Sequence, residues 1–453
     1  MTARVDAVVV GAGVIGLSAA WRLRAHGLGV LVLDPDAGGG ATHAAAGMLG
    51  AGSEAWFGHD ELRRWCTRSW QAWPAFRSEL ATAAGVDLPW AATRTFAVAV
   101  TAADAPALRR HAELIRACGL GASEVSVREA VAREPALTPR LAAALDLDEP
   151  AVDPRAVVLA LRRALERAGV PVRAVAVGAV GTGSVRLADG ETLAAGHVVV
   201  AAGHATRAID GVPRDLLDGL HAVKGQILRL SAPRAGGLVD VPTHVVRGLV
   251  DGRPVYVVPH GGGRVAVGAT SEDRDDLTVT AGGVHRLLDD ALRLVPGLDE
   301  FTLDEAIARL RPATDSHVPV VREVSPGVVV AAGHGRNGVL LAPATADAVV
   351  QLVARAGPAA SAPPPTAPAA PAVATVRRAR ADGVAAVRVN GEEAEWAVDL
   401  AVSALLARLR PDLPAGRGVA VAVDSEVVPR HRWDDVLVGA GQQVEVLTAI
   451  QGG

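Results

Sequence analysis

The sequence predicts an α/β domain built on a parallel sheet, an antiparallel sheet domain inserted into it, and a small separate β/α domain at the carboxyl end. Three observations predict this. Residues 5–34 read as strand, glycine turn, helix and strand. Buried apolar strands return late in the chain, at 198–203 and 328–333, so the region between belongs to an insertion. Residues 357–374 then change to Pro and Ala, with six prolines and no charged residue, as in an extended linker.

Length and composition limit the class of protein. The 453 residues suffice for two or three domains, and half of them are hydrophobic. The net charge of -4 leaves no basic surplus for nucleic acid or anionic lipid, so we expect small-molecule or protein partners. Cys66 and Cys118 lack the spacing of a zinc site or a disulfide framework. Without a long uninterrupted apolar run we expect no membrane span and a cytoplasmic location.

The first strand, 6–10, leads into Gly11-Ala12-Gly13-Val14-Ile15-Gly16, and Asp34 ends the second strand. The first glycine permits the tight turn, the second lets the backbone approach a pyrophosphate, and the third lets helix and strand pack closely. The start of the helix attracts the anion, and Asp34 is placed to bind a ribose hydroxyl. The pattern predicts a Rossmann-like domain that binds a dinucleotide, and the carboxylate argues against NADP.

The remaining elements follow from periodicity. Residues 60–140 read as mostly helical, 155–169 as an amphipathic helix and 192–202 as a buried strand. Alternation over 221–271 predicts an antiparallel sheet, followed by helices at 282–294 and 343–355. Beyond the linker, 384–389 and the turn Asn390-Gly391 predict a hairpin, with a helix at 399–409 and strands at 419–423 and 443–449.

Several segments together resemble the D-amino acid oxidase superfamily of flavoenzymes. They are the glycine motif, 44–49, 199–203 and the run Gly333-His334-Gly335-Arg336-Asn337-Gly338. Segments 256–259, 268–270, 310–312 and 336–343 are most similar to its glycine oxidase branch, which serves thiamine biosynthesis. The resemblance spans 1–355 and implies non-covalent FAD, because neither cysteine lies near the flavin motifs. It implies cofactor contacts at Gly11, Gly13, Val14, Ile15, Gly16, Asp34, Thr42, Ala45, Ala46, Gly47, Met48, Val177, Ala202, Gly203, His334, Gly335, Arg336, Asn337, Gly338, Val339 and Leu340.

The same resemblance implies a substrate site. Oxidising an amino acid requires its Cα hydrogen to face the flavin, and an Arg can fix that pose by binding the carboxylate in a bidentate manner. We expect Arg311 to be this anchor, Tyr256 to donate a hydrogen bond, and Arg336 to lie between substrate and flavin, with Met48 nearby. A direct hydride transfer from a neutral amine needs no general base. We regard His334 as a neighbour of the flavin.

Other interpretations of these side chains remain open. Arg311 could form a salt bridge at the surface or between domains, Tyr256 could be a half-buried strand aromatic, and Arg336 could only fix its loop. Pro254 and Gly335 depart from the usual pattern, where bulkier residues can occur, and put the volume of the site in doubt.

The last domain resembles the thiamine sulfur carrier, a β-grasp, ubiquitin-like protein. The likeness runs from about 384 to Gly453 and rests on 387–392, 403–406, 419–430, Trp433 and 444–453. It implies that the carboxylate of Gly453 is adenylated by a partner and converted to a thiocarboxylate that donates sulfur. The thin Gly452-Gly453 end suits entry into another enzyme's channel.

We therefore expect a bifunctional protein of thiamine thiazole biosynthesis. Residues 1–355 would oxidise glycine with O₂ to iminoacetate and hydrogen peroxide. Their FAD-binding parts would be about 1–85, 150–215 and 320–355, and their substrate parts about 86–149 and 216–319. Residues 356–383 would be the linker and 384–453 the carrier. The alternative is a broader D-amino acid or sarcosine oxidase with a non-functional tail. Expected partners are an adenylyltransferase or sulfurtransferase, a thiazole synthase and a second copy of the chain in a homo-oligomer.

Overall fold

The computed structural model describes residues 5–233 and 239–356. Of the carboxyl-terminal part it describes 384–389, 392–397, 400–404, 419–423, 426–428, 433, 436–438 and 443–448. The chain divides into two compact units, Met1–Pro364 and Pro365–Gly453. We describe each unit by itself.

The first sheet carries the glycine turn. Its strand order is β15-β16-β9-β1-β2-β6, with the β7–β8 hairpin paired to β9. Strands β16, β9, β1, β2 and β6 run parallel, whereas β15 is antiparallel to β16. Its members are β1 Val5–Val10, β2 Val30–Leu33, β6 Val172–Arg173, β7 Val177–Gly181, β8 Ser184–Leu187, β9 Thr192–Val200, β15 Val320–Ser325 and β16 Val328–Ala332. Nearly continuous apolar runs such as Val328–Ala332 suit strands buried on both faces.

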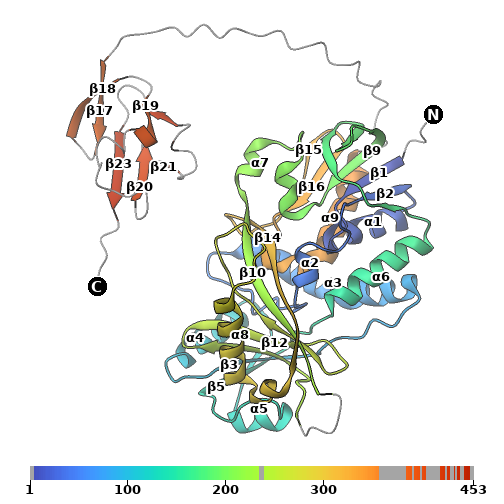
Figure 1. Cartoon of the computed structure of the whole chain (residues 1–453), viewed down its shortest axis with the longest axis vertical. Coiled ribbons are helices and arrows are strands. Elements are labelled where there is room, and N and C mark those ends of the chain that lie inside the picture. Colours follow the sequence, from blue (N-terminus) through green and yellow to red (C-terminus); the bar gives the residue numbers. More distant parts are fainter. Residues whose placement is uncertain are drawn as a thin grey trace. The chain divides into compact units, whose positions relative to one another are not determined.

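Both faces of this sheet are covered. Ala7 and Val9 point toward a core with the four long helices, whereas Val8 and Val10 point toward the β7–β8 hairpin and α7. The helices are α1 Val14–Ala25, α3 Asp60–Ala84, α6 Pro154–Arg167, α7 Arg214–Asp218 and α9 Gly338–Ala356. Figure 1 shows α1, α3, α6 and α9 gathered on one side of the sheet. Shorter helices are α2 Ala41–Ala44, η1 Gly203–Ala208 and η3 Gly335–Asn337.

Helix α9 begins five residues before the predicted start at 343. A proline is favoured in the first turn of a helix, which is why the sequence places the start there. In the structure Pro343 lies inside the helix, where it cannot donate to the backbone. The Ser69 hydroxyl compensates: it donates to the Leu340 carbonyl (2.7 Å) and accepts from the Ala344 N–H (3.2 Å). The Trp73 indole also donates to Leu340 (2.9 Å). Side chains of α3 thus let α9 continue through the proline.

The second sheet has the order β14-β10-β13-β12-β11-β3-β5-β4, antiparallel except where β11 pairs with β3. Its strands are β3 Thr95–Ala99, β4 Ala122–Val125, β5 Ala143–Leu147, β10 Leu220–Ser231, β11 Val245–Val250, β12 Arg253–Pro259, β13 Arg264–Gly268 and β14 Thr302–Thr314. Helices α4 Ala105–Ala117, α5 Val127–Arg133, α8 Ala281–Leu294 and η2 Pro296–Glu300 accompany it. The prediction that 60–140 is mostly helical misses β3 and β4, because Ala-rich composition masks the short alternation that buries Phe96 and Val98.

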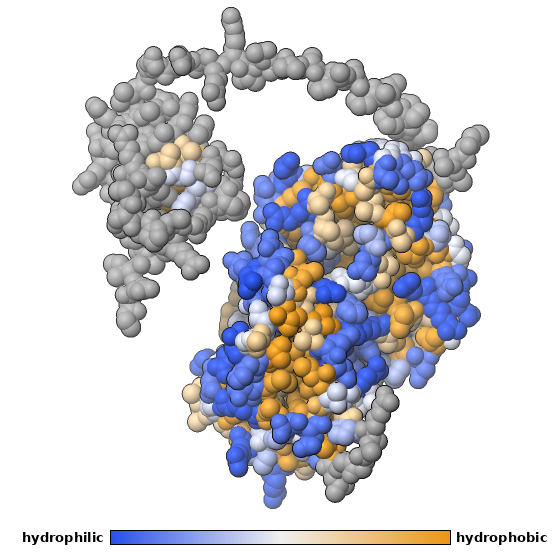
Figure 2. Space-filling model, viewed as in Figure 1, coloured by the Kyte–Doolittle hydropathy of each residue, from blue (hydrophilic) through white to orange (hydrophobic). Residues whose placement is uncertain are grey.

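Successive residues of the second sheet point to opposite faces. On one face Leu228, Leu230 and Val257 pack against α8. On the other face Ile227 and Val258 pack with Ala46, which follows α2 of the first domain. The second sheet therefore presents one face to its own core and one to the segment after α2. Figure 2 shows hydrophobic residues forming a band over the region of β10 and β12, with hydrophilic residues on both sides.

The carboxyl-terminal unit contains a five-stranded sheet of order β18-β17-β23-β20-β21 and a small β19-β22 pair. Its strands are β17 Val384–Val389, β18 Glu392–Ala397, β19 Leu400–Ala401, β20 Val419–Val423, β21 Glu426–Val428, β22 Leu437–Val438 and β23 Gln443–Thr448. The parallel pairing of β17 with β23 brings the first and last strands together. This confirms the predicted β-grasp fold.

Two further predictions concern this part of the chain. Of the predicted helix 399–409, residues 400–401 form β19 and residues 402–404 are helical, whereas 399 and 405–409 lie outside the described residues. The predicted linker beyond 356, the Asn390-Gly391 turn and the Gly452-Gly453 end also lie outside them.

Within the described part, one stretch, Gly335–Arg355, is long and apolar enough to cross a bilayer by length and composition. However, 61% of its most apolar window is buried inside the unit. There α9 packs against α1 and α3, as a core helix does.

Candidate substrate and cofactor site

The glycine turn after β1 has the tight geometry that the sequence predicts. Gly11 has φ +108, and a Cβ added there would lie 2.3 Å from the Ala201 carbonyl oxygen. A Cβ on Gly16 would lie 1.9 Å from the Gly11 carbonyl oxygen. Larger residues would push the turn away from β9 and α1, so these glycines keep the carboxyl edge of the sheet compact.

The start of α1 suits an anion. Its N-cap is Gly13, which makes no side-chain cap bond, and its first turn holds no acidic residue. The Thr42 hydroxyl lies beside it and accepts from the Val14 N–H (3.1 Å). Exposed N–H groups and the helix dipole attract negative charge at such an end. A dinucleotide's pyrophosphate therefore fits the turn and the helix start, Val14 and Ile15 included.

Asp34 lies at the carboxyl end of β2, one strand away from the turn. Its Oδ2 accepts from the Ala12 N–H (2.5 Å) and its Oδ1 from the Asp36 N–H (2.7 Å). Each oxygen keeps a further lone pair, so the carboxylate can still accept from a ribose hydroxyl. The donor and acceptor set at this edge thus fits an adenine dinucleotide.

Other predicted cofactor residues lie on elements around the same edge. Ala202 and Gly203 follow β9, and Gly203 has φ +60 with no atom within 4 Å of an added Cβ. Val177 begins β7, shortly after β6, whose Arg173 carbonyl accepts from the Asp34 N–H (3.1 Å). The remaining predicted contacts lie in η3 and the start of α9: Gly335, Arg336, Asn337, Gly338, Val339 and Leu340. Their contacts with a cofactor stay predictions.

His334 immediately precedes η3 and is buried. Its Nε2 lies 3.0 Å from the Thr345 hydroxyl, and burial lowers its pKa to about 3. The ring is therefore neutral near pH 7. This suits a structural neighbour of the cofactor better than an acid at this position.

A buried arginine supports the segment after α2, which holds the predicted contacts Ala45, Ala46 and Gly47. The Arg229 guanidinium donates to the Ala45 carbonyl (2.9 Å) and lies 2.6 Å from His260 Nδ1. His260 Nε2 lies 2.7 Å from the Ala46 carbonyl, so this nitrogen carries the proton and Nδ1 accepts. Burial and the adjacent Arg229 charge lower the pKa of His260 to about 4. Burial lowers the pKa of Arg229 to about 10, so the pair is a fixed cation beside a neutral ring.

The predicted anchor, Arg311, crosses strand β10. It lies on β14 opposite Val223, and its guanidinium lies directly over Gly225, where an added Cβ would be 2.2 Å from Nη2. Its Nη1 donates to the Thr270 carbonyl on the far side of β10 (3.1 Å). Burial lowers the pKa of Arg311. Within the described residues no carboxylate lies within ion-pair distance, so this cation retains donors for an anionic ligand.

Tyr256 lies on β12, on the same face as Arg311, with strands β10 and β13 between them. Gly268 is its partner on β13, and a Cβ there would lie 2.4 Å from the phenolic oxygen. Burial raises the pKa of Tyr256, whereas the Arg311 charge opposes that rise. The phenol is therefore protonated and can donate. Met48 packs with Tyr256 against the apolar group around Ala46, so the structure brings these predicted residues together.

Arg336 is already paired. Its Nε donates to Glu54 Oε2 (2.5 Å), and Glu54 Oε1 accepts from both terminal nitrogens of Arg247 on β11 (3.1 and 3.2 Å). Burial opposes ionisation of Glu54, but the Arg336 and Arg247 charges hold its pKa below the ordinary value. Arg336 is half exposed and keeps its terminal nitrogens free of Glu54. Its predicted role beside the substrate stays a prediction.

A second acid, Glu149, lies close to this group. Its Oε1 accepts from the Gly52 and Ser53 N–H groups (2.6 and 2.7 Å), while its buried Oε2 has no partner in the described structure. Burial raises the pKa of Glu149. Arg247 also donates to the Ser53 hydroxyl (2.7 Å). These contacts fix the segment that carries Glu54.

Sequence reasoning missed the side chains that surround the predicted residues: Glu54, Glu149, Arg229, Arg247, His260 and Thr270. One signal could have found two of them. Arg229 and Arg247 interrupt apolar strands, in Ile227-Leu228-Arg229-Leu230 and Val245-Val246-Arg247. An arginine on an inward position of a buried strand indicates either a partner acid or an anionic ligand.

Positive charge predominates around Tyr256. Three arginines, Arg229, Arg247 and Arg311, lie on three strands of the same face and act on the phenol, together with the acid Glu54. A surplus of buried positive charge is unfavourable unless an anion completes it. The arrangement can therefore bind a small carboxylate next to a protonated phenol.

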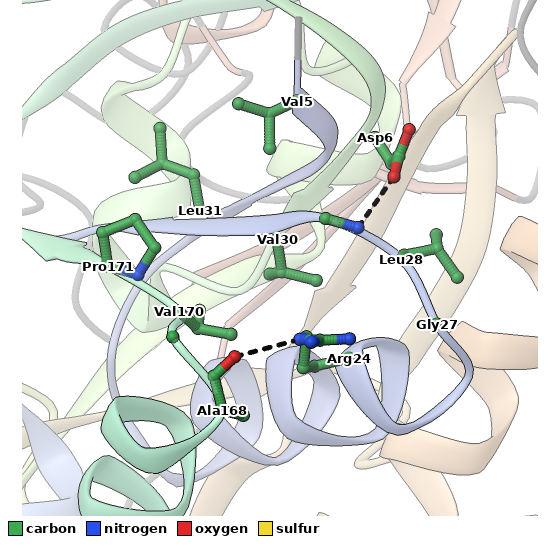
Figure 3. Close-up of a pocket in the computed structure, with 12 residues that line it drawn as sticks. Val5, Asp6, Arg24, Gly27, Leu28, Val30, Leu31, Ala168, Val170 and Pro171 are labelled. Carbon is green, nitrogen blue, oxygen red and sulfur yellow. Dashed lines mark hydrogen bonds between the residues drawn. The ribbon is translucent and has the colours of Figure 1, made fainter. Parts of the chain in front are cut away.

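A surface groove lies at the opposite end of the first sheet. It has a volume of about 520 Å³ and lies where β1 and β2 begin. Figure 3 shows Asp6 bonded to the backbone after Leu28, and Arg24 bonded to Ala168; these contacts are 2.7 and 3.2 Å. It contains none of the predicted site residues.

Comparison with family models divides the chain in the same way. Residues 6–352 match the DAO model, described as FAD dependent oxidoreductase, and residues 387–453 match the ThiS family.

Similar proteins cover the first region. Glycine oxidase of Geobacillus kaustophilus is 33% identical over 78% of this chain and 94% of its own length. Bifunctional protein ThiO/ThiG of a Nostoc species is 29% identical over 77% of this chain, which spans about half (52%) of that protein. The crystal structure of the Geobacillus kaustophilus glycine oxidase superposes with a TM-score of 0.70 over 78% of this chain and 95% of its own, at 30% identity. The crystal structure of iminodiacetate oxidase from Chelativorans sp. BNC1 superposes with a TM-score of 0.67 over 77% of this chain and 95% of its own, at 25% identity.

Proposed function

From the premise that this chain belongs to the FAD dependent oxidoreductase family and ends in a ThiS-family domain, we propose that it oxidises glycine with O₂ and carries sulfur on its carboxyl terminus for thiamine thiazole formation. The observation that carries the oxidase half is Arg311, a buried guanidinium that crosses Gly225 and has no carboxylate partner in the described residues. The glycine oxidase relatives support the choice of substrate.

Each side chain has a defined task in this proposal. Arg311 binds the glycine carboxylate, and Tyr256 donates to the same group from β12, on the same face of the sheet. Arg336 closes the site from η3, and its ion pair with Glu54 fixes its direction. FAD, when bound, supplies the two-electron acceptor for the Cα–H bond and passes the electrons to O₂, giving iminoacetate and hydrogen peroxide. Glycine must enter as the neutral amine, because no general base is assigned beside the anchor.

Residues of the first domain hold the cofactor. Gly11, Gly13 and Gly16 with the start of α1 receive the pyrophosphate, and Asp34 receives a ribose hydroxyl. Segment Ala45–Gly47, supported by Arg229 and His260, and the run from His334 to Leu340 flank the flavin ring. The site cannot exclude small relatives of glycine completely, since one methyl group is worth only about 1–3 kcal/mol of discrimination.

Substitution of the anchor tests the oxidase half. Arg311→Met should raise KM for glycine roughly 10- to 100-fold, because a charge-assisted contact contributes about 1.5–3 kcal/mol. The KM of Arg311→Lys should lie between those of the wild type and Arg311→Met, since lysine keeps the positive charge but cannot form the bidentate hydrogen bonds of a guanidinium. The control is Arg322→Met, an exposed arginine on β15. Peroxide release is measured with glycine, sarcosine and D-alanine. Unchanged glycine turnover in Arg311→Met, or a strong preference for bulky D-amino acids in the wild type, would contradict the proposal.

The carrier half rests on the ThiS-family match, which reaches Gly453. In this proposal a partner adenylates the Gly453 carboxylate, a sulfurtransferase step replaces one oxygen by sulfur, and a thiazole synthase consumes that sulfur. Intact-mass spectrometry of protein from thiamine-producing cells should show a species heavier by the replacement of one oxygen with one sulfur. Fragmentation should place the change in the terminal peptide. A terminal peptide that stays unmodified during thiamine synthesis would reject the carrier role.

A further inference from the structure

We infer that Lys224 is a positioning residue for the substrate anchor: by neutralising Glu272 it keeps the Arg311 guanidinium directed at the substrate carboxylate. The inference rests on the proposed function, because it takes Arg311 as that anchor. Lys224 is the only lysine in the chain, and its side chain is fully buried. A buried cation of this kind needs compensating charge.

The backbone places Lys224 beside the anchor. Residues 270–272 continue alongside β10 after β13 ends: the Thr270 N–H donates to the Gln226 carbonyl (3.1 Å), and Lys224 and Glu272 exchange backbone hydrogen bonds (3.0 and 2.9 Å). Gly225, which Arg311 crosses, lies between Lys224 and Gln226. Lys224 and Gln226 therefore hold residues 270–272 in place, and the Thr270 carbonyl of this segment orients Arg311.

Side-chain contacts strengthen this arrangement through Glu272. Its Oε1 accepts from the Thr270 hydroxyl (2.6 Å) and from Gln226 Nε2 (2.6 Å), and its Oε2 lies 3.7 Å from Lys224 Nζ. Burial opposes ionisation, but the Thr270 and Gln226 hydrogen bonds and the Lys224 charge hold the pKa of Glu272 below its ordinary value. Glu272 is thus an anion two residues after Thr270, whose carbonyl accepts a hydrogen bond from Arg311.

The rest of the network makes this geometry rigid. Lys224 Nζ also donates to Asp276 (2.7 Å), which has a second cation in Arg274 (2.7 Å). Gln226 Oε1 accepts from the Thr280 N–H (2.8 Å), and Thr280 caps α8. Glu272 has no such second cation at ion-pair distance among the described residues. Lys224 is therefore the cation at ion-pair distance that offsets the negative charge of Glu272.

Loss of the lysine charge has a specific consequence. Glu272 would keep its negative charge, and this charge already acts on Arg311, whose pKa it raises. The guanidinium would then turn toward Glu272, sharing donors that the substrate carboxylate needs. Substrate binding would weaken, whereas the electron-transfer step would keep its rate once glycine is bound.

The test is a double-mutant cycle in the full-length holoenzyme. Lys224→Met keeps a long apolar stem and removes the charge. We expect KM for glycine to rise roughly tenfold, with kcat unchanged within about twofold. Lys224→Met/Glu272→Gln removes both charges, while the Gln amide can still accept from Thr270; KM should return to within about threefold of the wild-type value. Acetate affinity, followed by the flavin absorption spectrum, should change in parallel.

Arg274→Met is the matched control, because it removes an exposed cation of the same segment that pairs with Asp276. It should leave KM and acetate affinity unchanged. An unchanged KM in Lys224→Met with normal flavin content, or a double variant as impaired as the single one, overturns the inference. Those outcomes leave the proposed function intact, provided that Arg311→Met still raises KM. Absence of glycine oxidation in the wild type would instead reject the function itself.

Discussion

Two glycines determine where the largest polar side chains of the site lie. Gly225 provides the space in which Arg311 crosses β10, and Gly268 provides the space beside the Tyr256 ring. Neither glycine is needed for a positive φ angle. At each position a Cβ would occupy the place of Arg311 or Tyr256 atoms, so both glycines belong to the candidate site although they offer it no functional group.

The prediction at this scale concerns Gly268→Ala. The new Cβ would lie 2.4–2.7 Å from three atoms of the Tyr256 side chain, too close for either group to stay in place. We expect kcat/KM for glycine to fall roughly tenfold or more, since the phenol moves away from the carboxylate. Gly282→Ala is the control, because the nearest atom to its Cβ is 3.6 Å away, at Arg286. Equal kinetics for the two variants would contradict the role given to Tyr256.

At the residue scale, the sequence indicated side chains that lie in family motifs, but it did not indicate the side chains that surround them. Arg311 and Tyr256 belong to short recognisable segments. Glu54 and Arg247 are separated by 193 residues, and no local pattern links them. The gathering of the arginines on this face follows from the placement of β10, β11 and β14 in one sheet, which no local sequence pattern indicates.

At the scale of elements, two neutral histidines stabilise the segments around the cofactor edge. His260 follows β12 and bonds the segment after α2, while His334 precedes η3. Burial keeps both rings uncharged, with pKa values of about 4 and about 3. In the unfolded chain each ring would take up a proton near pH 6.5.

This difference predicts acid sensitivity. As the pH falls below about 6.5, the unfolded chain binds protons that the folded chain does not, so each histidine lowers the unfolding free energy by up to about 1.4 kcal/mol per pH unit. For His260 the loss should reach about 3 kcal/mol near pH 4, where the folded ring also titrates. Urea unfolding at about pH 7, 6 and 5 measures how the free energy of unfolding changes with pH. His260→Gln should reduce the slope. The same slope in wild type and variant would show that other groups dominate.

Elements with a clear apolar period were predictable, and those set by distant contacts were not. The predicted helix 282–294 differs from α8 by a single residue at its start. Helix α9 was placed too late because only the contact from Ser69, 271 residues before Leu340, shows why Pro343 is tolerated. Strands β3 and β4 were missed because their pairing partners, β11 and β5, lie elsewhere in the chain.

At the scale of the whole molecule, the chain joins two modules of one proposed pathway. Covalent linkage fixes their ratio at one to one and raises the concentration of each near the other. It does not require that an intermediate pass directly between them. The proposed roles are chemically separate, because the oxidase uses residues of 1–356 and the carrier uses the carboxyl terminus.

Deletion of Gly452-Gly453 from the full chain tests that separation. Glycine oxidation should keep its kcat and KM within about twofold, since no site residue of the oxidase lies in the tail. Sulfur loading should be abolished, because the reactive carboxylate is removed. Peroxide release and intact mass are the two measurements. Loss of glycine oxidation would show that the tail takes part in the oxidase site.

The burial of Lys224 has a consequence for the carrier as well. An adenylated or thiolated carboxyl terminus is an acylating agent, and free amines are the groups with which it reacts. The chain places its single lysine inside β10, with no solvent exposure and with Asp276 and Glu272 against the ammonium group. In the proposed carrier role, the activated glycine would therefore meet no accessible lysine amine on the same chain, and self-conjugation through an isopeptide bond to lysine would not compete with sulfur delivery.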